Sequence, residues 1–155
     1  MNPYECDGDS DLTSLLGFFQ IEAPCISSFQ SYKLDESKYC KVLRKMISGK
    51  AFLFINPQAR IDKRLTSFNM CDGKIKCVGI RGLLKKQNKD ENELVCLLRH
   101  IRNSVAHGRV FAKSVGGVMY ILLDDTRPDG KFSARIIVTK NYLKTWKKII
   151  IANMR

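Results

Sequence analysis

Residues 97–108 read LLRHIRNSVAHG and end the segment with the clearest helical pattern, residues 88–107. Four apolar side chains in this segment follow the spacing i, i+4, i+7 and i+11 of one helix face: Leu94, Leu98, Ile101 and Val105. Asp90, with Glu93 three residues later, resembles a capping box, and Gly108 stands where a left-handed cap would end the helix. The pattern therefore predicts an amphipathic helix whose polar end carries an arginine, an asparagine and a histidine.

Helical signals also fill most of the chain before this segment. The expected helices span residues 9–21, the stretch from Ser27 or Ser28 to Ile47, a stretch from Pro57 that includes Arg60, Leu65 and Phe68, and residues 78–86. Residues 51–56 are apolar and fit either a strand or a helix. Residues 69–73, NMCDG, predict a turn, because Asp-Gly supplies the backbone freedom that a turn requires.

A β-hairpin is predicted after the central helix. Residues 118–123 form an apolar run rich in residues that favour strands, residues 129–130 give an Asp-Gly turn signal, and residues 132–138 predict a returning strand. Residues 141–153 then predict a last helix. Trp146 is expected on its core-facing side as a packing anchor rather than as a surface for base stacking.

The domain organisation follows from these elements. No internal repeat, low-complexity tract or Pro/Gly-rich linker divides the sequence, so residues 1–155 are expected to form a single domain. A chain of 155 residues is long enough to bury a core of its own. The number of helical segments predicts a mainly α fold in which a β-hairpin precedes the C-terminal helix.

The chain is strongly basic, with 27 Lys and Arg against 15 Asp and Glu and a formal net charge of +12. The excess lies mainly in residues 41–50, 81–89, 99–113 and 140–148. A field of this sign raises the local concentration and the association rate of nucleic acid. The alternative is that lysine-rich faces only keep the protein in solution. Charge by itself leaves both interpretations open.

The cysteines and the apolar runs argue against several classes of protein. The six cysteines are scattered, and the closest pair, Cys71 and Cys77, is spaced more widely than zinc-binding pairs. No metal or cofactor is therefore expected, and no Gly-rich phosphate loop is present. The N-terminus is acidic without an apolar signal segment, and residues 118–123 and 149–152 are too short to cross a bilayer. We expect a cytoplasmic protein without a membrane partner.

Arg102, Asn103 and His107 supply groups that phosphodiester chemistry needs. An arginine binds phosphate, and an imidazole moves a proton near neutral pH. At about 100° per residue, Asn103 and His107 fall on the same helix face, and Arg102 lies about 140° from His107. A long arginine can still share a phosphate with the imidazole across that angle. The alternative is a surface arginine and a histidine that is favoured by the dipole at a helix C-terminus.

This arrangement resembles the HEPN superfamily (higher eukaryotes and prokaryotes nucleotide-binding). Its ribonuclease members carry an arginine, usually a polar residue next to it, and a histidine after about three more residues. Arg102, Asn103 and His107 match these positions, and the run LRHIRNSVAHG is particularly similar to HEPN nucleases of plasmid and phage-defence type. The resemblance covers about a dozen residues. It implies a HEPN-like helical bundle, to which the hairpin would be an insertion or an addition.

The resemblance implies a metal-independent endoribonuclease that cleaves RNA through attack by the adjacent 2′-hydroxyl. His107 is expected to act as general base or acid. Arg102 is expected to hold the phosphate and stabilise its charge in the transition state, and Asn103 to orient the histidine or a phosphate oxygen. Further candidates for substrate contact lie beside them: Arg99, Ser104 and Arg109.

A second proton-transfer group is needed, and His100 lies about two turns before His107, a poor position for that role. A two-fold dimer would present His107 twice. HEPN nucleases resemble this solution, so we expect a homodimer whose products are a 2′,3′-cyclic phosphate and a 5′-hydroxyl. The resemblance also suggests a toxin–antitoxin or phage-defence role, with an antitoxin protein as a partner. The alternative is a non-catalytic HEPN-like module that binds RNA or a protein partner.

Overall fold

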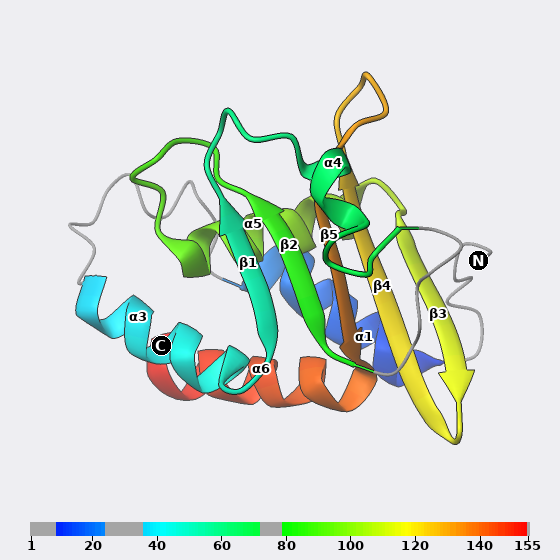
Figure 1. Cartoon of the computed structure of the whole chain (residues 1–155). Coiled ribbons are helices and arrows are strands. Elements are labelled where there is room, and N and C mark those ends of the chain that lie inside the picture. The colour runs from blue at the N-terminus through cyan, green and yellow to red at the C-terminus, as the bar shows by residue number, and fades with distance from the viewer. Residues whose placement is uncertain (1–8, 24–35, 72–78, 155) are drawn as a thin grey trace.

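The computed structural model describes residues 9–23, 36–71 and 79–154. Its centre is a five-stranded sheet with the strand order β1-β2-β5-β4-β3 (Figure 1). The strands are β1 (Ala51–Ile55), β2 (Arg81–Lys85), β3 (Val110–Val115), β4 (Val118–Thr126) and β5 (Phe132–Thr139). β1 and β2 pair in parallel, and all other neighbouring strands pair antiparallel.

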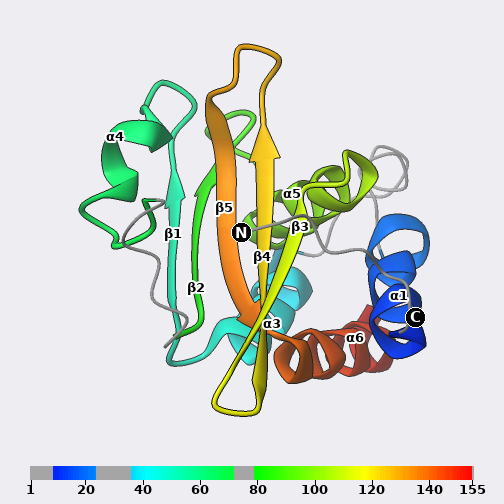
Figure 2. The same ribbon diagram turned by 90° about the vertical axis from the view of Figure 1, so that its right-hand side faces the viewer.

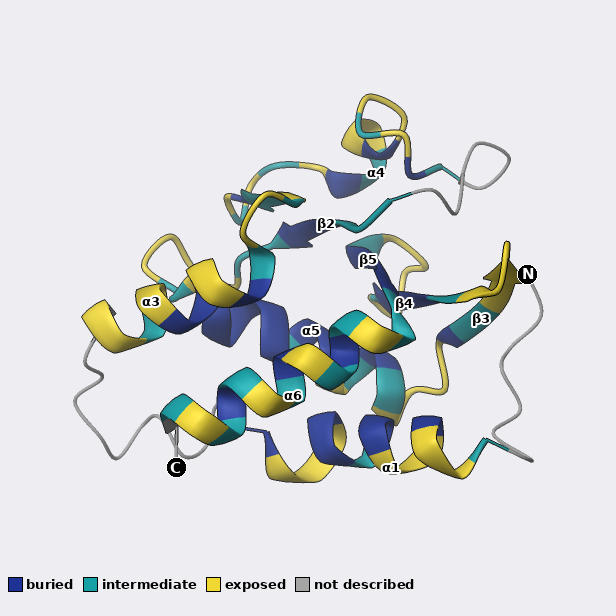
Figure 3. Ribbon diagram, turned by 90° about the horizontal axis from the view of Figure 1, so that it is seen from below, coloured by how far each residue is buried: buried dark blue, intermediate teal, exposed yellow. Residues whose placement is uncertain are grey.

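Helices cover the two faces of the sheet unequally (Figure 2). One face is packed by α1 (Ser10–Gly17), the π-helix η1 (Phe18–Glu22), α3 (Glu36–Ile47), α5 (Glu93–Ala106) and α6 (Lys140–Met154). The short helix α4 (Ile61–Leu65) lies on the opposite face over a smaller core. Figure 3 shows that α1 and α6 turn their buried residues inward and their exposed residues outward. No helix in the described ranges combines the length and the apolar character needed to cross a membrane.

Strand β4 supplies side chains to both cores, because successive residues of a strand point to opposite faces. Ile121 belongs to the main core under the large helical layer, and Leu122 belongs to the smaller core under α4. Asp124 and Asp125 continue this alternation, and both are buried. Two adjacent carboxylates therefore enter opposite sides of the sheet, where each needs a partner of its own.

The expected mainly α bundle is wrong, because the sheet forms the centre of the fold. Residues 81–85, expected within a helix, form β2 between β1 and β5. Residues 51–55 form β1, and residues 110–115 form β3, a strand that the sequence pattern did not predict. Apolar runs of about five residues are too short to show a helical or a strand period. Pairing with neighbouring strands therefore decides their conformation.

The predicted hairpin and several predicted helices are confirmed, with altered ends. β4 and β5 contain the two predicted strands, and α6 is the last predicted helix, with Trp146 fully buried. α1 and η1 together fill the first predicted helix, with Asp9 as its N-cap. α4 is shorter than the helix expected from Pro57. Residues 27–28, the expected caps of the second helix, and residues 72–73 of the expected turn lie outside the described residues.

Helix α5 begins later than expected and ends as predicted. Its N-cap is Asn92, whose side-chain oxygen accepts a backbone amide two residues later at 2.9 Å. The expected capping box from Asp90 to Glu93 is therefore wrong. Gly108 adopts a φ of 63°, in the left-handed region where a residue without a Cβ is favoured. This cap leaves His107 as the last residue before the chain turns towards β3.

Candidate functional site

A basic cleft opens where three strands end. β1, β2 and β4 run in the same direction, so their carboxyl ends meet at one edge of the sheet, beside helix α5. The cleft has a volume of about 570 Å³. Its charged and imidazole side chains are Lys85, Lys86, Arg99, His100 and Arg127. None of the described residues that line the cleft is acidic, so it attracts anions.

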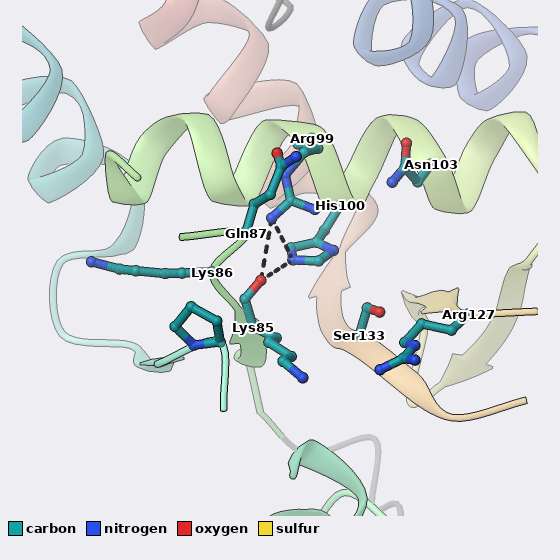
Figure 4. A pocket seen from close by; sticks show the side chains of 9 residues that line it. Lys85, Lys86, Gln87, Arg99, His100, Asn103, Arg127 and Ser133 are labelled. Atoms are coloured by element: carbon teal, nitrogen blue, oxygen red, sulfur yellow. Dashed lines mark hydrogen bonds between the residues drawn. The ribbon is translucent and has the colours of Figure 1, made fainter. Parts of the chain in front are cut away.

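His100 closes the inner end of the cleft and is fully buried. Its Nδ1 lies 2.6 Å from Oδ2 of Asp125, and its Nε2 lies 2.7 Å from the carbonyl oxygen of Lys85. Asn103 donates a hydrogen bond from Nδ2 to the same oxygen of Asp125 at 3.1 Å. Figure 4 shows the side chains of Arg99 and His100 meeting at the Lys85 carbonyl. These contacts join α5 to the ends of β2 and β4.

The hydrogen bonds of His100 engage both nitrogens of its ring. Besides the Lys85 carbonyl oxygen, Nε2 has Nη2 of Arg99 as a second polar neighbour, at 3.2 Å. The contact between Nδ1 and Asp125 is a hydrogen bond in which one proton lies between the imidazole and the carboxyl group. Both ring nitrogens are engaged, so His100 has no nitrogen left for proton transfer to a ligand.

Arg99 is held at the cleft by Glu91. Its Nε and Nη2 donate to the two carboxylate oxygens of Glu91 at 2.8 and 2.9 Å, a bidentate geometry that fixes the orientation of the guanidinium. Burial by itself raises the pKa of Glu91. Hydrogen bonds from Arg99 and from the Gln87 amide outweigh that effect and hold the pKa below its usual value. Glu91 is therefore ionised at neutral pH and keeps Arg99 in place.

Replacing Glu91 by glutamine is expected to lower the free energy of unfolding by about 1 kcal/mol at neutral pH, because a charge-assisted pair is lost. A carboxylate with a lowered folded-state pKa stabilises the fold above its unfolded pKa, near 4.5, and this stabilisation is lost as pH falls through the folded pKa. Urea unfolding at neutral and at strongly acidic pH should therefore show a difference from the wild type only at neutral pH. An equal difference at both would contradict this role.

The cleft offers positive charge and hydrogen-bond donors to a ligand. Cys96 lies behind it, where burial raises the pKa of the thiol and keeps it protonated, so this thiol is not an activated nucleophile. In the described part of the chain, no group of three or more His, Cys, Asp or Glu side chains is arranged to hold a metal ion. The chemistry of the lining is therefore suited to holding an anion.

The structure divides the six predicted site residues between the cleft and its surroundings. Two of them line the cleft: Arg99 and Asn103. Three are exposed and lie outside its lining: Arg102, His107 and Arg109. Ser104 is fully buried, and its hydroxyl donates to the backbone carbonyl of His100 at 2.8 Å. This bond within the helix occupies the hydroxyl, which cannot reach a substrate from its buried position.

His107 lies next to the strand that forms the inner end of the cleft. It is the C-cap of α5, and Asn103, four residues earlier, lies on the same side of the helix. The carbonyl oxygen of Arg109 accepts the Asp124 amide at 3.1 Å. The turn at residues 107–109 is thereby bonded to β4 one residue before Asp125. Helix α5 thus connects the cleft to an exposed histidine.

The sequence did not predict that His100 belongs to the cleft. His100 was considered only as a second proton-transfer group and was rejected because it lies about two turns before His107. A signal was present, because Cys96 and Ser104 lie four residues before and after it on the face that packs against the sheet. A histidine on a buried helix face needs hydrogen-bond partners. Its partner, Asp125, lies 25 residues further along the chain, and only the sheet brings the two together.

The fold and the cleft define a basic α/β protein in which one helix carries both an anion-attracting cleft and an exposed histidine. The family model for HEPN pEK499 p136 matches residues 12–154 and places the chain in the HEPN superfamily. Within it, the chain belongs to the HEPN pEK499 p136 family. No curated protein and no solved structure matches the chain. Family membership is consistent with a nuclease or another RNA-related module.

Proposed function

We propose that the protein is a metal-independent endoribonuclease that cleaves RNA by transesterification at the 2′-hydroxyl. The observation that carries this proposal is the exposure of Arg102 and His107 on the end of α5, the helix that also lines a cleft whose described lining residues include no acidic side chain. Membership of the HEPN pEK499 p136 family supports an RNA-related role. A net charge of +12 favours a polyanionic substrate.

Each proposed catalytic residue has a distinct task. In the reaction the 2′-oxygen loses its proton to a base and bonds to phosphorus, while the bond to the 5′-oxygen breaks and an acid protonates that oxygen. His107 serves as the base or the acid. Arg102 binds the phosphate and stabilises its developing charge. Asn103 donates a hydrogen bond from Nδ2 to Asp125. The side-chain oxygen of Asn103 is then left to orient the imidazole of His107.

The histidine content of the chain supports a dimeric site. The sequence has two histidines, and His100 is buried with both ring nitrogens engaged. One protomer therefore presents one accessible imidazole, His107, whereas the reaction needs an acid and a base. A two-fold dimer supplies His107 from both protomers to one site. Light scattering should then give twice the chain mass of 17.7 kDa.

The test of the activity is cleavage of labelled single-stranded RNA by the purified protein in EDTA. The expected products are fragments that end in a 2′,3′-cyclic phosphate and a 5′-hydroxyl, because the attacking oxygen stays on phosphorus. A matched RNA in which every 2′-hydroxyl is methylated should remain intact, since it lacks the nucleophile. Activity that requires a divalent metal, or cleavage of the methylated RNA, would contradict the mechanism.

The second candidate function is a non-catalytic module that binds RNA or a protein partner. The single accessible imidazole of each protomer favours it if the protein is a monomer, because one histidine then has no complementary acid or base. RNA binding without any cleavage, by a protein that light scattering shows to be monomeric, would support this function over the nuclease.

We place the nuclease in the cytoplasm, in a toxin–antitoxin or phage-defence system, with an antitoxin protein as its partner. This role follows from the resemblance of residues 98–108 to HEPN nucleases of plasmid and phage-defence type. Expression of the wild-type protein in a bacterial host should then slow growth, whereas an equally expressed Arg102→Ala variant should not. Equal growth of the two strains would argue against the toxin role while leaving the cleavage reaction to be judged by its own assay.

A further inference from the structure

We propose that the cleft beside α5 is a binding site for the phosphate group of a nucleotide. Arg102 and His107 lie outside the lining of this cleft, although Asn103 belongs to both sites, and the proposal does not depend on cleavage. It rests on the charge of the cleft lining, on the way Arg99 is held, and on the burial of Asp125 behind the lining in hydrogen bonds with His100 and Asn103. The bound phosphate belongs either to a free nucleotide or to a nucleotide within an RNA strand.

Four cations from three segments of the chain line the cleft: Lys85, Lys86, Arg99 and Arg127. In the described ranges no carboxylate lies within ion-pair distance of Lys85. Lys86 and Arg127 have only exposed acidic partners outside the cleft, at 3.6 and 3.4 Å. Exposed pairs of this kind contribute little free energy, so both cations remain available to a ligand.

Glu91 holds the guanidinium of Arg99 in one orientation, which favours the binding of an anion. Glu91 engages its Nε and Nη2, whereas its Nη1 makes no hydrogen bond within the described residues. Because the bidentate pair with Glu91 fixes the guanidinium plane, Arg99 can bind an anion in the cleft with little loss of side-chain freedom. A phosphate oxygen is a strong acceptor for such a donor.

The carboxylate nearest the inner end of the cleft is engaged inside the protein. Asp125 is buried outside the cleft lining, and His100 and Asn103 both hydrogen-bond to its Oδ2. Figure 4 shows Arg127 and Ser133 on the opposite side from α5. Amide and hydroxyl groups of Gln87, Asn103 and Ser133 also line the cleft and can bond a sugar or a base. A volume of about 570 Å³ lies within the range of small-molecule sites.

Binding can be measured without cleavage. The probe is a fluorescent single-stranded oligonucleotide of 2′-O-methyl ribonucleotides, which lacks the attacking hydroxyl, and its Kd is obtained from fluorescence anisotropy. Lys85→Gln and Arg127→Gln each remove one cleft cation. Lys148→Gln is the matched control, because it removes the same charge from an exposed position on α6 outside the cleft.

We expect each cleft variant to raise the Kd about tenfold, the effect of losing a charge-assisted hydrogen bond, and the control to raise it less than about twofold. Competition with adenosine 5′-monophosphate, against adenosine as the phosphate-free control, separates the two sources of the phosphate. Displacement by the monophosphate alone assigns the cleft to free nucleotides. No displacement by either, with the cleft variants still weak, assigns it to phosphates within a strand.

Equal weakening by all three variants would overturn the proposal, because it would show attraction by net charge rather than a built site. Absence of binding by the wild type to both the probe and the monophosphate would overturn it as well. Arg127 lies in an exposed connection, so its variant reports on binding even if Lys85→Gln fails to fold. If the wild type cleaves RNA and all variants bind the probe with the wild-type Kd, only the proposed phosphate site is contradicted. If the cleft variants bind the probe more weakly than the Lys148→Gln control but the wild type does not cleave RNA, only the proposed nuclease activity is contradicted.

Discussion

Replacing His107 by alanine is expected to lower the rate of RNA cleavage by about 100- to 10,000-fold, the range that general acid–base catalysis contributes. The expected loss is large because His107 is the accessible imidazole of each protomer, and a two-fold dimer loses both copies at once. His100 cannot substitute for it, since both of its ring nitrogens are engaged inside the protein. Initial rates on labelled single-stranded RNA in EDTA measure the effect.

The control must show that the variant remains folded. His107 is exposed at the end of α5, so its loss should change the free energy of unfolding by no more than about 1 kcal/mol, the usual size of a helix-dipole effect. Lys148→Ala, an exposed change on α6, should leave the cleavage rate near that of the wild type. Unchanged cleavage by pure, folded His107→Ala would eliminate the proposed mechanism.

Replacing Arg135 by methionine is expected to lower the free energy of unfolding by about 3–5 kcal/mol, because it removes the cation that pairs with a buried carboxylate. Arg135 and Asp124 face each other across β5 and β4, and both are at least nine-tenths buried. Their two hydrogen bonds are each 2.8 Å long, and Nη1 of Arg135 also donates to the carbonyl oxygen of Met70 at 2.8 Å. This arginine thus joins the sheet to the loop after α4.

Urea unfolding followed by the fluorescence of Trp146, the single and fully buried tryptophan, measures this loss. The double variant Arg135→Met with Asp124→Leu is the control, since it removes both charges and leaves no carboxylate to be desolvated. It should regain most of the stability that the single variant loses. A single variant as stable as the wild type would show that the ion pair does not stabilise the fold.

The contrast between α5 and β2 shows which parts of the fold were predictable. The apolar stripe of α5 extends over several turns, and Gly108 marks its end, so its existence and its C-terminus followed from the residues themselves. Residues 81–85 contain one short apolar run between basic residues, and they were misread as helical. Gly82 lies in this strand because the ring of Phe52 on β1 occupies the space that a Cβ would need. That requirement is set by a neighbour 30 residues away in the sequence.

The candidate site also has one part that follows from local sequence and one part that depends on distant contacts. Arg102, Asn103 and His107 lie within six residues on one helix, so their proximity follows from helical geometry alone. The cleft combines residues from the ends of β2 and β4 with one side of α5, and its inner end depends on the contact between His100 and Asp125. No local pattern in the sequence reports a contact between such distant segments.

The sequence by itself determined the amphipathic helix, its exposed arginine and histidine, the hairpin that follows, and the basic charge, because each depends on residues close together in the chain or on composition. Only the tertiary structure decided the five-stranded sheet, the burial of His100 and Ser104, and the basic cleft. Those features depend on strand pairing and on the burial of polar groups, whose free energy is set by partners that the chain brings together only when it folds.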